Sequence, residues 1–323
     1  MASLYAIAFL IVLFVLEVFY FKLANKFNII DQPNERSSHT SITLRGGGII
    51  FSIAGLLWFF FYGFQYPCFI AGLFLISLIS FLDDLHTLNN KTRLSIHLLA
   101  VLLLFYQWGL FEWSWYWIPI ALIFVIGTIN AYNFMDGING ITGAYSFVTV
   151  CTLYYINANL VSFTSPSLLI IVILSLLVFN FFNFRKKAKC FAGDVGSISI
   201  AFLIVFFIGQ LILRTGDFVY ILLLLFYGLD TAITILFRLI RRENIFKAHR
   251  SHFYQFLANE KKWPHLLVSS LYFFVQLIIN VLMIFFIRSS VFWGVLVAII
   301  TTISFLLIRF WLEGRKRLVQ EIR

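Results

Sequence analysis

The chain has 323 residues, of which 61% are hydrophobic and only 12% are charged, and its formal net charge is +10. This composition excludes an ordinary soluble domain, because apolar runs of about 20 residues match the ~30 Å hydrocarbon core of a bilayer. The runs are continuous rather than alternating, which argues against a membrane β-barrel. Cys68, Cys151 and Cys190 are far apart and have no metal-type spacing, so we expect them to be unpaired.

Eleven apolar runs follow one another along the chain. We therefore predict an all-α fold, a polytopic bundle of about 11 transmembrane helices that forms a single domain over residues 1–323. The first run lacks a basic stretch before it and a small-residue cleavage site after it, so we expect a retained span rather than a signal peptide. The runs lie at 3–24, 47–64, 67–83, 94–111, 117–132, 141–157, 166–183, 196–213, 217–237, 266–287 and 291–311.

The basic residues predict the orientation of the bundle. When the connections alternate between two sides, only Arg214 and Arg288 of the 24 lysines and arginines fall on one of them. The positive-inside rule assigns the other, basic side to the cytoplasm, with the N-terminus outside and the C-terminus inside. This asymmetry explains the net charge without a nucleic-acid partner, and part of it can hold anionic membrane lipids.

Two acidic clusters fall on the basic side. Asp83 and Asp84 end the third run, where adjacent carboxylates near a bilayer need a cation, a metal or a proton to compensate them. Solvation of a helix end by headgroups is the simpler alternative. Asp194 stands between glycines, close to the basic residues at 185–189, which suits a metal–phosphate site but equally suits the N-cap of the next helix.

A third cluster consists of Asn130, Asn133, Asp136 and Asn139, which recur at three-residue spacing. On a helix, residues with this spacing share a face. Neighbouring glycines permit a close approach of the backbone to a ligand or to another helix. Packing of helices through small residues, with Asn side chains between them, is the alternative, but it leaves Asp136 unexplained.

The remaining clusters offer donors for an anion. His249, Arg250 and His252 lie in the longest basic loop and suit phosphate oxygens, although a solvated loop has the same composition. Arg45 precedes three glycines that can wrap an anion or simply open the second span, and the polar segment 36–39 comes before it. Within the spans, we expect Asp230 to anchor the ninth near the site, while Glu17 has no evident role.

Several catalytic motifs are absent from the sequence. It has no P-loop, dinucleotide fingerprint, His-Glu-x-x-His zinc pattern or Gly-x-Ser-x-Gly elbow. The chemistry must then come from carboxylates, amides, histidines and a bound ion. Asp, Asn, Arg and His together at one membrane face describe a site for a magnesium-bound polyphosphate.

In their order and spacing, these segments resemble the polyprenyl-phosphate N-acetylhexosamine-1-phosphate transferases, of glycosyltransferase family 4 type, over about residues 30–255. The branch that initiates O-antigen and related surface glycans is the most similar, and phospho-MurNAc-pentapeptide transferase is a more distant relative. The resemblance implies transfer of a sugar-1-phosphate from a UDP-N-acetylhexosamine to undecaprenyl phosphate, with release of UMP. It also implies Mg²⁺ as cofactor, with Mn²⁺ as an alternative, and a place in the bacterial cytoplasmic membrane.

The resemblance further implies roles for individual residues. Asp83 and Asp84 serve the lipid phosphate as base or electrostatic organiser. Asp194 and Asn133 hold the metal, and Phe191 stacks on uracil. The other substrate-binding positions are Arg45, Asn130, Asp136, Asn139, His249, Arg250 and His252.

Some positions depart from the family pattern. Asn139 replaces a second Asp of many relatives, which weakens any metal role there, and Thr43-Leu44 stands where a proline is usual. The histidine motif is not the triple histidine of the cell-wall enzyme, which argues against a MurNAc-pentapeptide donor. As mechanism we expect in-line attack of the lipid phosphate on the β-phosphorus, with a covalent aspartyl-phosphate as the minority alternative. A transporter or flippase of an anionic lipid or nucleotide-sugar is the main rival function, and a homodimer stays open.

Overall fold

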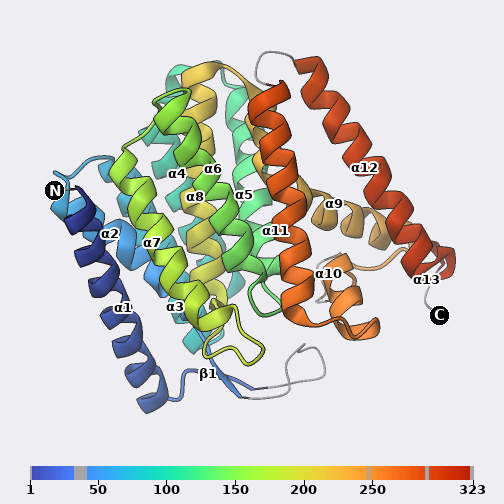
Figure 1. Cartoon of the computed structure of the whole chain (residues 1–323), viewed down its shortest axis with the longest axis horizontal. Helices are drawn as coiled ribbons and strands as arrows, with labels where there is room; N and C mark the ends of the chain where they lie inside the picture. Colours follow the sequence, from blue (N-terminus) through green and yellow to red (C-terminus); the bar gives the residue numbers. More distant parts are fainter. Residues whose placement is uncertain (1, 33–41, 246, 248, 288–290, 321–323) are drawn as a thin grey trace.

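The structure is a computed structural model, and it describes residues 2–32, 42–245, 247, 249–287 and 291–320 (Figure 1). Each of the predicted apolar runs coincides with a helix, so the all-α prediction is confirmed. The long helices are α1 (Ala2–Lys26), α2 (Ile49–Phe61), α3 (Pro67–Leu85), α4 (Asn90–Gln107), α5 (Trp117–Met135), α6 (Ile141–Asn159), α7 (Pro166–Asn183), α8 (Gly193–Thr215), α9 (Leu225–Ile240), α11 (His265–Leu282) and α12 (Val291–Glu313). The short elements are β1 (Ile30–Asp31), β2 (Thr43–Leu44), η1 (Leu110–Glu112), η2 (Phe218–Leu224), α10 (Phe253–Gln255), η3 (Phe256–Glu260), η4 (Met283–Ile287) and α13 (Arg315–Val319).

Within the described ranges, 8 helical segments are long and apolar enough to cross a membrane, and the chain is a multi-pass membrane protein. The predicted runs at α2, α4 and α6 are helices too, but α2 has only 13 residues, and polar side chains lower the hydropathy of α4 and α6. Length and composition therefore support fewer spans than the sequence predicted. The count of 11 and the orientation of the termini stay predictions.

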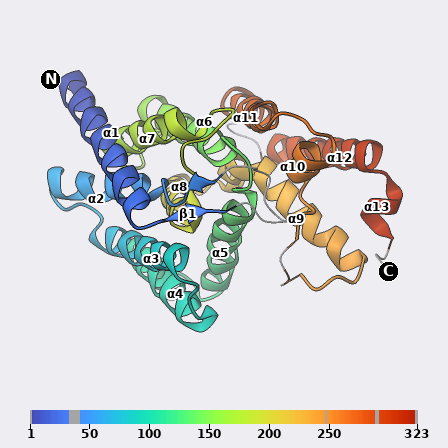
Figure 2. The ribbon, with the colours of Figure 1, turned by 90° about the horizontal axis from the view of Figure 1, so that it is seen from below.

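Helix α8 occupies the centre of the bundle, with α3 and α5 on one side and α6 and α7 on the other (Figure 2). A helix that is apolar on all sides is expected to be buried. In α8, 89% of the residues in its most apolar 18-residue stretch are buried. The ring of Phe206 stacks on Phe69 of α3 with a centroid distance of 3.7 Å. The centre of the fold thus holds the start of α8, residues 193–197, in a fixed place.

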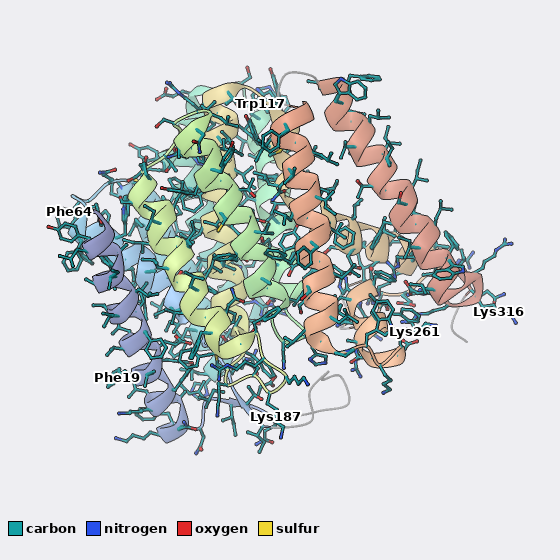
Figure 3. The ribbon with its side chains drawn as sticks, viewed as in Figure 1. Phe19, Phe64, Trp117, Lys187, Lys261 and Lys316 are labelled. Carbon is teal, nitrogen blue, oxygen red and sulfur yellow. The ribbon has the colours of Figure 1, made fainter. Side chains whose placement is uncertain are left out.

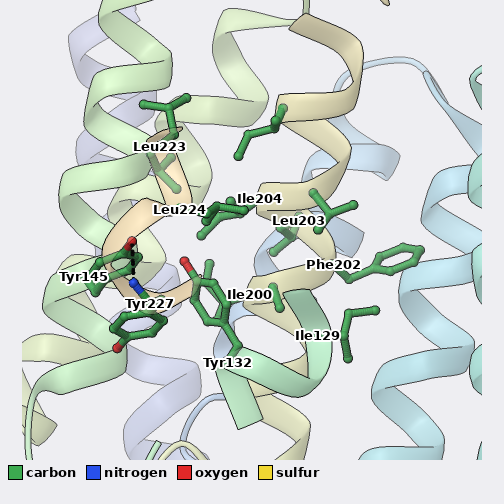
Figure 4. Close-up of a cluster of buried hydrophobic side chains, with 14 of the residues drawn as sticks. Ile129, Tyr132, Tyr145, Ile200, Phe202, Leu203, Ile204, Leu223, Leu224 and Tyr227 are labelled. Atoms are coloured by element: carbon green, nitrogen blue, oxygen red, sulfur yellow. Dashed lines mark hydrogen bonds between the residues drawn. The ribbon is translucent and has the colours of Figure 1, made fainter. Parts of the chain in front are cut away.

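A polar network ties α6, α9 and α11 together inside this apolar core. The rings of Tyr145 and Tyr227 stack 3.6 Å apart, and the Tyr227 N–H donates to the Tyr145 hydroxyl (Figure 4). That hydroxyl donates to Gln276 Oε1 at 2.7 Å. Pairing of this kind is what allows polar groups to be buried.

The ends of the bundle differ in chemistry. Lys187 and Lys261 lie at the end opposite Trp117, while Phe19 and Phe64 point away from the flank formed by α1 and α2 (Figure 3). The loops at the lysine end also carry β1 and β2, which pair antiparallel with Ile30 opposite Leu44. The polar clusters predicted from the sequence gather at this end.

Candidate functional site

The start of α8 is capped by a carboxylate from another helix. Asp84, in the last turn of α3, accepts the backbone N–H groups of Asp194 and Val195, each at 3.0 Å. The first N–H groups of a helix have no partner within the helix and are stabilised by such an acceptor. The alternative that Asp194 itself forms the N-cap is therefore wrong: Asp194 is the second residue of α8, and its side chain is left for another role.

Three aspartates and two arginines form an ionic cluster around this cap. Arg45 Nε lies 2.7 Å from Asp84, and Arg45 Nη2 lies 3.7 Å from Asp194. Arg93 Nη1 lies 2.5 Å from Asp83 and 3.9 Å from the other oxygen of Asp194. The side chain of Asp84 is 0% exposed, that of Asp83 9% and that of Asp194 20%, so Asp194 is the most open carboxylate of the three.

Arg93 was missed as a site residue by reasoning from the sequence. The sequence analysis counted Arg93 only as one of the basic residues that predict the orientation of the bundle in the membrane. Arg93 lies in the first turn of α4, ten residues after Asp83 in the last turn of α3. Because two helices joined by a short connection pack side by side, this spacing could have predicted the contact. Asp83 also accepts the N–H of Leu88 at 2.8 Å, which fixes the connection between α3 and α4.

The three glycines after Arg45 serve packing against the start of α8. The N–H of Gly48 donates to the carbonyl of Ala192 at 3.1 Å, and the N–H of Phe191 donates to the carbonyl of Leu44 at 2.8 Å. A Cβ on Gly48 would lie 2.3 Å from the Cα of Gly196, so a larger residue cannot fit. The glycine run brings Arg45 to the cluster by close backbone contact, and Phe191 lies half-buried at this junction.

Two residues of α1 support the same junction. Tyr20 donates its hydroxyl proton to the Arg45 carbonyl at 2.6 Å. Glu17 is fully buried, with Oε1 3.8 Å from the Cys190 sulfur. The sequence suggested no role for Glu17, and the structure places it behind the glycine run, next to Gly47.

The end of α5 lies against the first turn of α8. The Ser197 hydroxyl donates to Asn133 Oδ1 at 2.9 Å. The prediction that Asn130, Asn133, Asp136 and Asn139 share one helix face is wrong beyond the second of them, because α5 ends at Met135. Asn130 is exposed on the last turns of α5.

Asp136, the residue after α5, lies in the field of the ionic cluster. Burial raises its pKa to about 7; the negative charges of Asp194 and Asp84 add to this rise, and Arg45 opposes it. A carboxylate with this pKa exchanges its proton near neutral pH. Asp136 therefore belongs electrostatically to the same site.

Asn139 has a fixed set of partners in the turn before α6. Its Nδ2 donates to the carbonyls of Arg185 and Lys186 at 2.9 and 3.3 Å, and its own carbonyl accepts the Ser269 hydroxyl proton at 2.7 Å. The side chain is buried. Asn139 thus anchors the basic loop after α7 to α11, beside the site.

Asp230 of α9 holds the backbone directly after the histidine segment, which we define as residues 249–252. Asp230 accepts the N–H groups of Phe253 and Tyr254 at 2.8 and 3.3 Å, at the start of α10. It also accepts the Tyr272 hydroxyl at 2.6 Å, and His252 Nδ1 lies 3.6 Å away. The expected anchoring role of Asp230 therefore has a concrete form, a cap on α10.

The histidine segment meets the end of α5. The ring of Phe134 lies 6.2 Å from both His249 and His252, and the Tyr254 hydroxyl donates to the Phe134 carbonyl at 2.8 Å. His252 is buried, whereas His249 and Arg250 are half-buried. Burial and the charges of His252 and of Arg238 lower the pKa of His249 to about 4, so its imidazole is neutral at pH 7.

The structure thus brings most of the predicted residues to one end of the bundle. Arg45, Asp83, Asp84 and Asp194 are in direct contact, and Asn133 and Asp136 border them. The histidine segment joins through the end of α5, while Asn130 and Asn139 lie at the margin. The predicted polar segment 36–39 lies outside the described residues.

The donor set can be compared with what a magnesium ion needs. Among the residues that the structure describes, no three His, Cys, Asp or Glu side chains are arranged to hold a metal. Mg²⁺ needs fewer, because it binds one or two protein oxygens together with phosphate oxygens and water. Asp194 offers a partly open carboxylate, which Arg45 and Arg93 face at distances longer than hydrogen bonds. The amide oxygen of Asn133 is a second candidate donor, and it accepts the Ser197 hydroxyl proton in this structure.

Apolar grooves lie between the helices of the bundle. One, of about 770 Å³, lies between α1, α2 and α3, and Asp84 is part of its lining. Another, of about 660 Å³, lies between α6, α7 and α11 and extends to Phe184 and Arg185. A third, of about 470 Å³, lies between α5 and α9, with Tyr132 and Gly228 in its walls.

Comparison with known proteins gives a consistent picture. The model of glycosyl transferase family 4 matches residues 66–212. A "Probable undecaprenyl-phosphate N-acetylglucosaminyl 1-phosphate transferase" of Bacillus subtilis (strain 168) is 28% identical over 252 residues, which cover 72% of this chain and 70% of that protein.

Two relatives carry the name "Phospho-N-acetylmuramoyl-pentapeptide-transferase". The protein of Thermotoga neapolitana is 31% identical over 173 residues, and that of Streptococcus pneumoniae serotype 19F is 32% identical over 181 residues. Each match covers 48% of this chain, with 56% of the Thermotoga protein and 55% of the Streptococcus protein. The chain thus spans little more than half the length of these two relatives.

Proposed function

Since the chain belongs to the family of polyprenyl-phosphate sugar-1-phosphate transferases, we propose that it transfers a sugar-1-phosphate from a UDP-N-acetylhexosamine to undecaprenyl phosphate and releases UMP. We place this reaction at the cytoplasmic face of a bacterial inner membrane, as the first membrane step of O-antigen or another surface glycan. The observation that carries the proposal is the cluster of Asp83, Asp84 and Asp194 with Arg45 and Arg93. Asp84 of this cluster also lines the apolar groove between α1, α2 and α3.

Asp194 and Asn133 would hold a magnesium ion, which supplies charge stabilisation to the departing phosphate when bound. Arg45 and Arg93 are donors that suit the oxygens of a pyrophosphate. The neutral His249 and the guanidinium of Arg250 add donors on the side of the histidine segment. Phe191 at the junction of β2 and α8 offers a ring for the base.

The reaction we propose is a single in-line displacement. An oxygen of the lipid phosphate forms a bond to the β-phosphorus, while the bond from that phosphorus to the oxygen bridging to the α-phosphate breaks, and UMP leaves with its electron pair. Both oxygens of Asp84 accept backbone N–H groups, and one also contacts Arg45. This engagement supports a role for Asp84 as electrostatic organiser rather than as a covalent nucleophile.

We propose that the polyprenyl chain lies in the groove between α5 and α9. The lining of that groove runs along α5 as far as Tyr132, the residue before Asn133. The groove beside α1 ends at Asp84, whose side chain is fully buried and occupied. A chain in the α5–α9 groove therefore brings its phosphate to the open side of the cluster.

The decisive assay uses the purified full-length protein with undecaprenyl phosphate, MgCl₂ and a panel of UDP-sugars, and measures released UMP and the lipid product. We expect UMP from an N-acetylhexosamine donor, with undecaprenyl-pyrophosphate sugar in equal amount. No UMP from any donor would overturn the proposal. A phosphorylated Asp83 or Asp84 trapped during turnover would replace the single displacement with a covalent route.

A further inference from the structure

Helix α12 carries a buried arginine near its C-terminal end. It lies with α13 at the edge of the molecule beside α9 and α10 (Figure 2). Only 11% of the residues in its most apolar 18-residue stretch are buried. Arg309 is nevertheless only 1% exposed. A guanidinium is costly to bury in a membrane helix unless its N–H groups are paired, so its partners indicate its role.

The partners of Arg309 lie on the elements around the histidine segment. Its Nη2 donates to the carbonyl of Ser251 at 3.0 Å, and its Nη1 donates to Thr234 Oγ1 at 2.9 Å. Nη1 also lies 4.0 Å from Asp230. Its Nε donates to Glu313 at 2.5 Å. Arg309 therefore joins α12, α9 and the histidine segment.

Arg309 and Asp230 hold neighbouring groups of the same backbone segment, one as a hydrogen-bond donor and the other as an acceptor. Arg309 donates to the Ser251 carbonyl, and Asp230 accepts the N–H groups of Phe253 and Tyr254. Between these anchors lies His252. The backbone path of the histidine segment is thereby set from a helix outside residues 66–212, which the family model matches.

The support continues into the C-terminal turn. Glu313 also accepts from Arg317 Nε at 3.0 Å, and Arg317 forms an ion pair with Glu260 of η3. The Arg317 guanidinium lies 4.7 Å from the centre of the Phe256 ring. Helices α12 and α13 thus hold both α10 and η3, the elements that follow the histidine segment.

We propose that Arg309 is a positioning residue of the donor site, which acts through the Ser251 carbonyl to hold His249 and Arg250 toward the phosphates of the nucleotide-sugar. This inference rests on the proposed function. A misplacement of about 1 Å at a catalytic site can cost about 100-fold in rate. Loss of this support should therefore affect donor use more than acceptor use.

The test is a double-mutant cycle in the full chain, with Arg309→Met, His249→Ala and the pair. We expect Arg309→Met to lower kcat/KM for the UDP-sugar by about 10- to 100-fold, and KM for undecaprenyl phosphate to change less than about twofold. The double variant should be no worse than the more damaged single variant, since both changes act on one segment. Multiplicative losses would mean that Arg309 acts independently of the histidine segment and would overturn the inference.

Further measurements separate positioning from stability. UDP binding, measured by calorimetry without turnover, should weaken in Arg309→Met but be restored in part by Arg309→Lys, which keeps a donor. Arg315→Met, which removes an exposed arginine from α13, is the matched control and should bind UDP as the wild type does. If Arg309→Met does not fold, the cycle is run with Arg309→Lys, and additivity there would count equally against the inference.

The outcomes also separate this inference from the proposed function. A wild-type protein without transferase activity would overturn the function itself. An active wild type with an equally active Arg309→Met variant would overturn only the role of Arg309.

Discussion

Asp84 and Asp194 are neighbours in space with different surroundings. Asp84 is fully buried and accepts two backbone N–H groups at the start of α8, besides its contact with Arg45. Asp194 faces both arginines only at 3.7 and 3.9 Å and is partly open. One carboxylate is therefore engaged in structure, and the other is available to a ligand.

Substitution should separate these two roles. Asp84→Asn should lower the free energy of unfolding by about 2 kcal/mol, because it weakens a helix cap and removes the negative charge nearest to Arg45. Asp194→Asn should change stability by less than about 0.5 kcal/mol but reduce transferase activity by about 100-fold or more. Thermal unfolding in detergent and UMP release measure the two effects, and equal loss of stability in both variants would contradict the assignment.

Asp136 should make stability depend on pH. Its pKa is raised to about 7 in the folded chain by burial, whereas an unfolded Asp titrates near ~3.9. Between these values the folded chain holds a proton that the unfolded chain has lost, so this residue lowers stability as pH rises from about 4 to about 7, with no further change above.

The comparison with Asp136→Asn isolates this effect. The variant should gain thermal stability relative to wild type at pH 8 but little at pH 4.5. The difference between the two proteins matters, because His249, with a pKa lowered to about 4, acts in the opposite direction in both of them. An equal response of both proteins to pH would show that Asp136 is already ionised in the fold.

At the level of single residues, the sequence identified site residues where an unusual side chain stands at an unusual place in the chain. Paired or glycine-flanked aspartates at the ends of apolar runs are rare enough to attract attention, and Asp83, Asp84 and Asp194 do meet. Arg93 was not identified, since nothing in the neighbouring sequence distinguishes it from the other basic residues of the loops. Which aspartate caps and which stays open depends on contacts between α3 and α8, across 110 residues of sequence.

At the level of elements, two helices begin on carboxylates supplied by other helices. Asp84 of α3 caps α8, and Asp230 of α9 caps α10. Local capping rules search the residues at the helix start itself, so from the sequence Asp194 was an equally good candidate for the first cap. The end of α5 was misjudged for a related reason: the regular spacing through Asn139 continues past Met135, where the helix stops.

The groove between α5 and α9 permits a direct test of where the acceptor chain lies. A Cβ on Gly228 would meet nothing within 4 Å, so Gly228→Leu should fold and fill the groove. We expect KM for undecaprenyl phosphate to rise about tenfold, which corresponds to ~1.4 kcal/mol, while KM for the UDP-sugar stays constant.

Ile53→Phe is the matched variant for the groove beside α1. It should leave both KM values unchanged. A rise in the acceptor KM for Ile53→Phe, with none for Gly228→Leu, would place the chain in the other groove.

At the level of the whole molecule, composition and charge predicted the class and the working end. Apolar runs identified the helices, but the count of 11 spans stays a prediction, because α4 and α6 combine apolar stretches with polar side chains. Such helices are stabilised by their neighbours in the bundle, which a window along the sequence does not include. The ionic cluster nevertheless lies at the start of α8, directly after the basic loop that follows α7.

The predicted orientation can be tested by labelling. With Cys68 and Cys151 replaced by alanine, Trp115→Cys and Lys316→Cys each introduce one exposed thiol, since both positions are exposed. A membrane-impermeant maleimide applied to spheroplasts should label position 115, and position 316 should react only after lysis. The reverse pattern would place the basic end outside the cell.

Arg45 and Arg93, which lie between the three aspartates, link the two soluble ligands thermodynamically. In the free protein they balance the charge of Asp194. The guanidinium groups of Arg45 and Arg93 would be repelled by a divalent cation at Asp194 and attracted by the oxygens of a pyrophosphate. Under the proposed function, each ligand thus makes the site more favourable for the other, and by reciprocity the two affinities rise by the same factor. The arginines that offset most of the negative charge of the acidic cluster would therefore favour the cation–nucleotide complex over either ion alone.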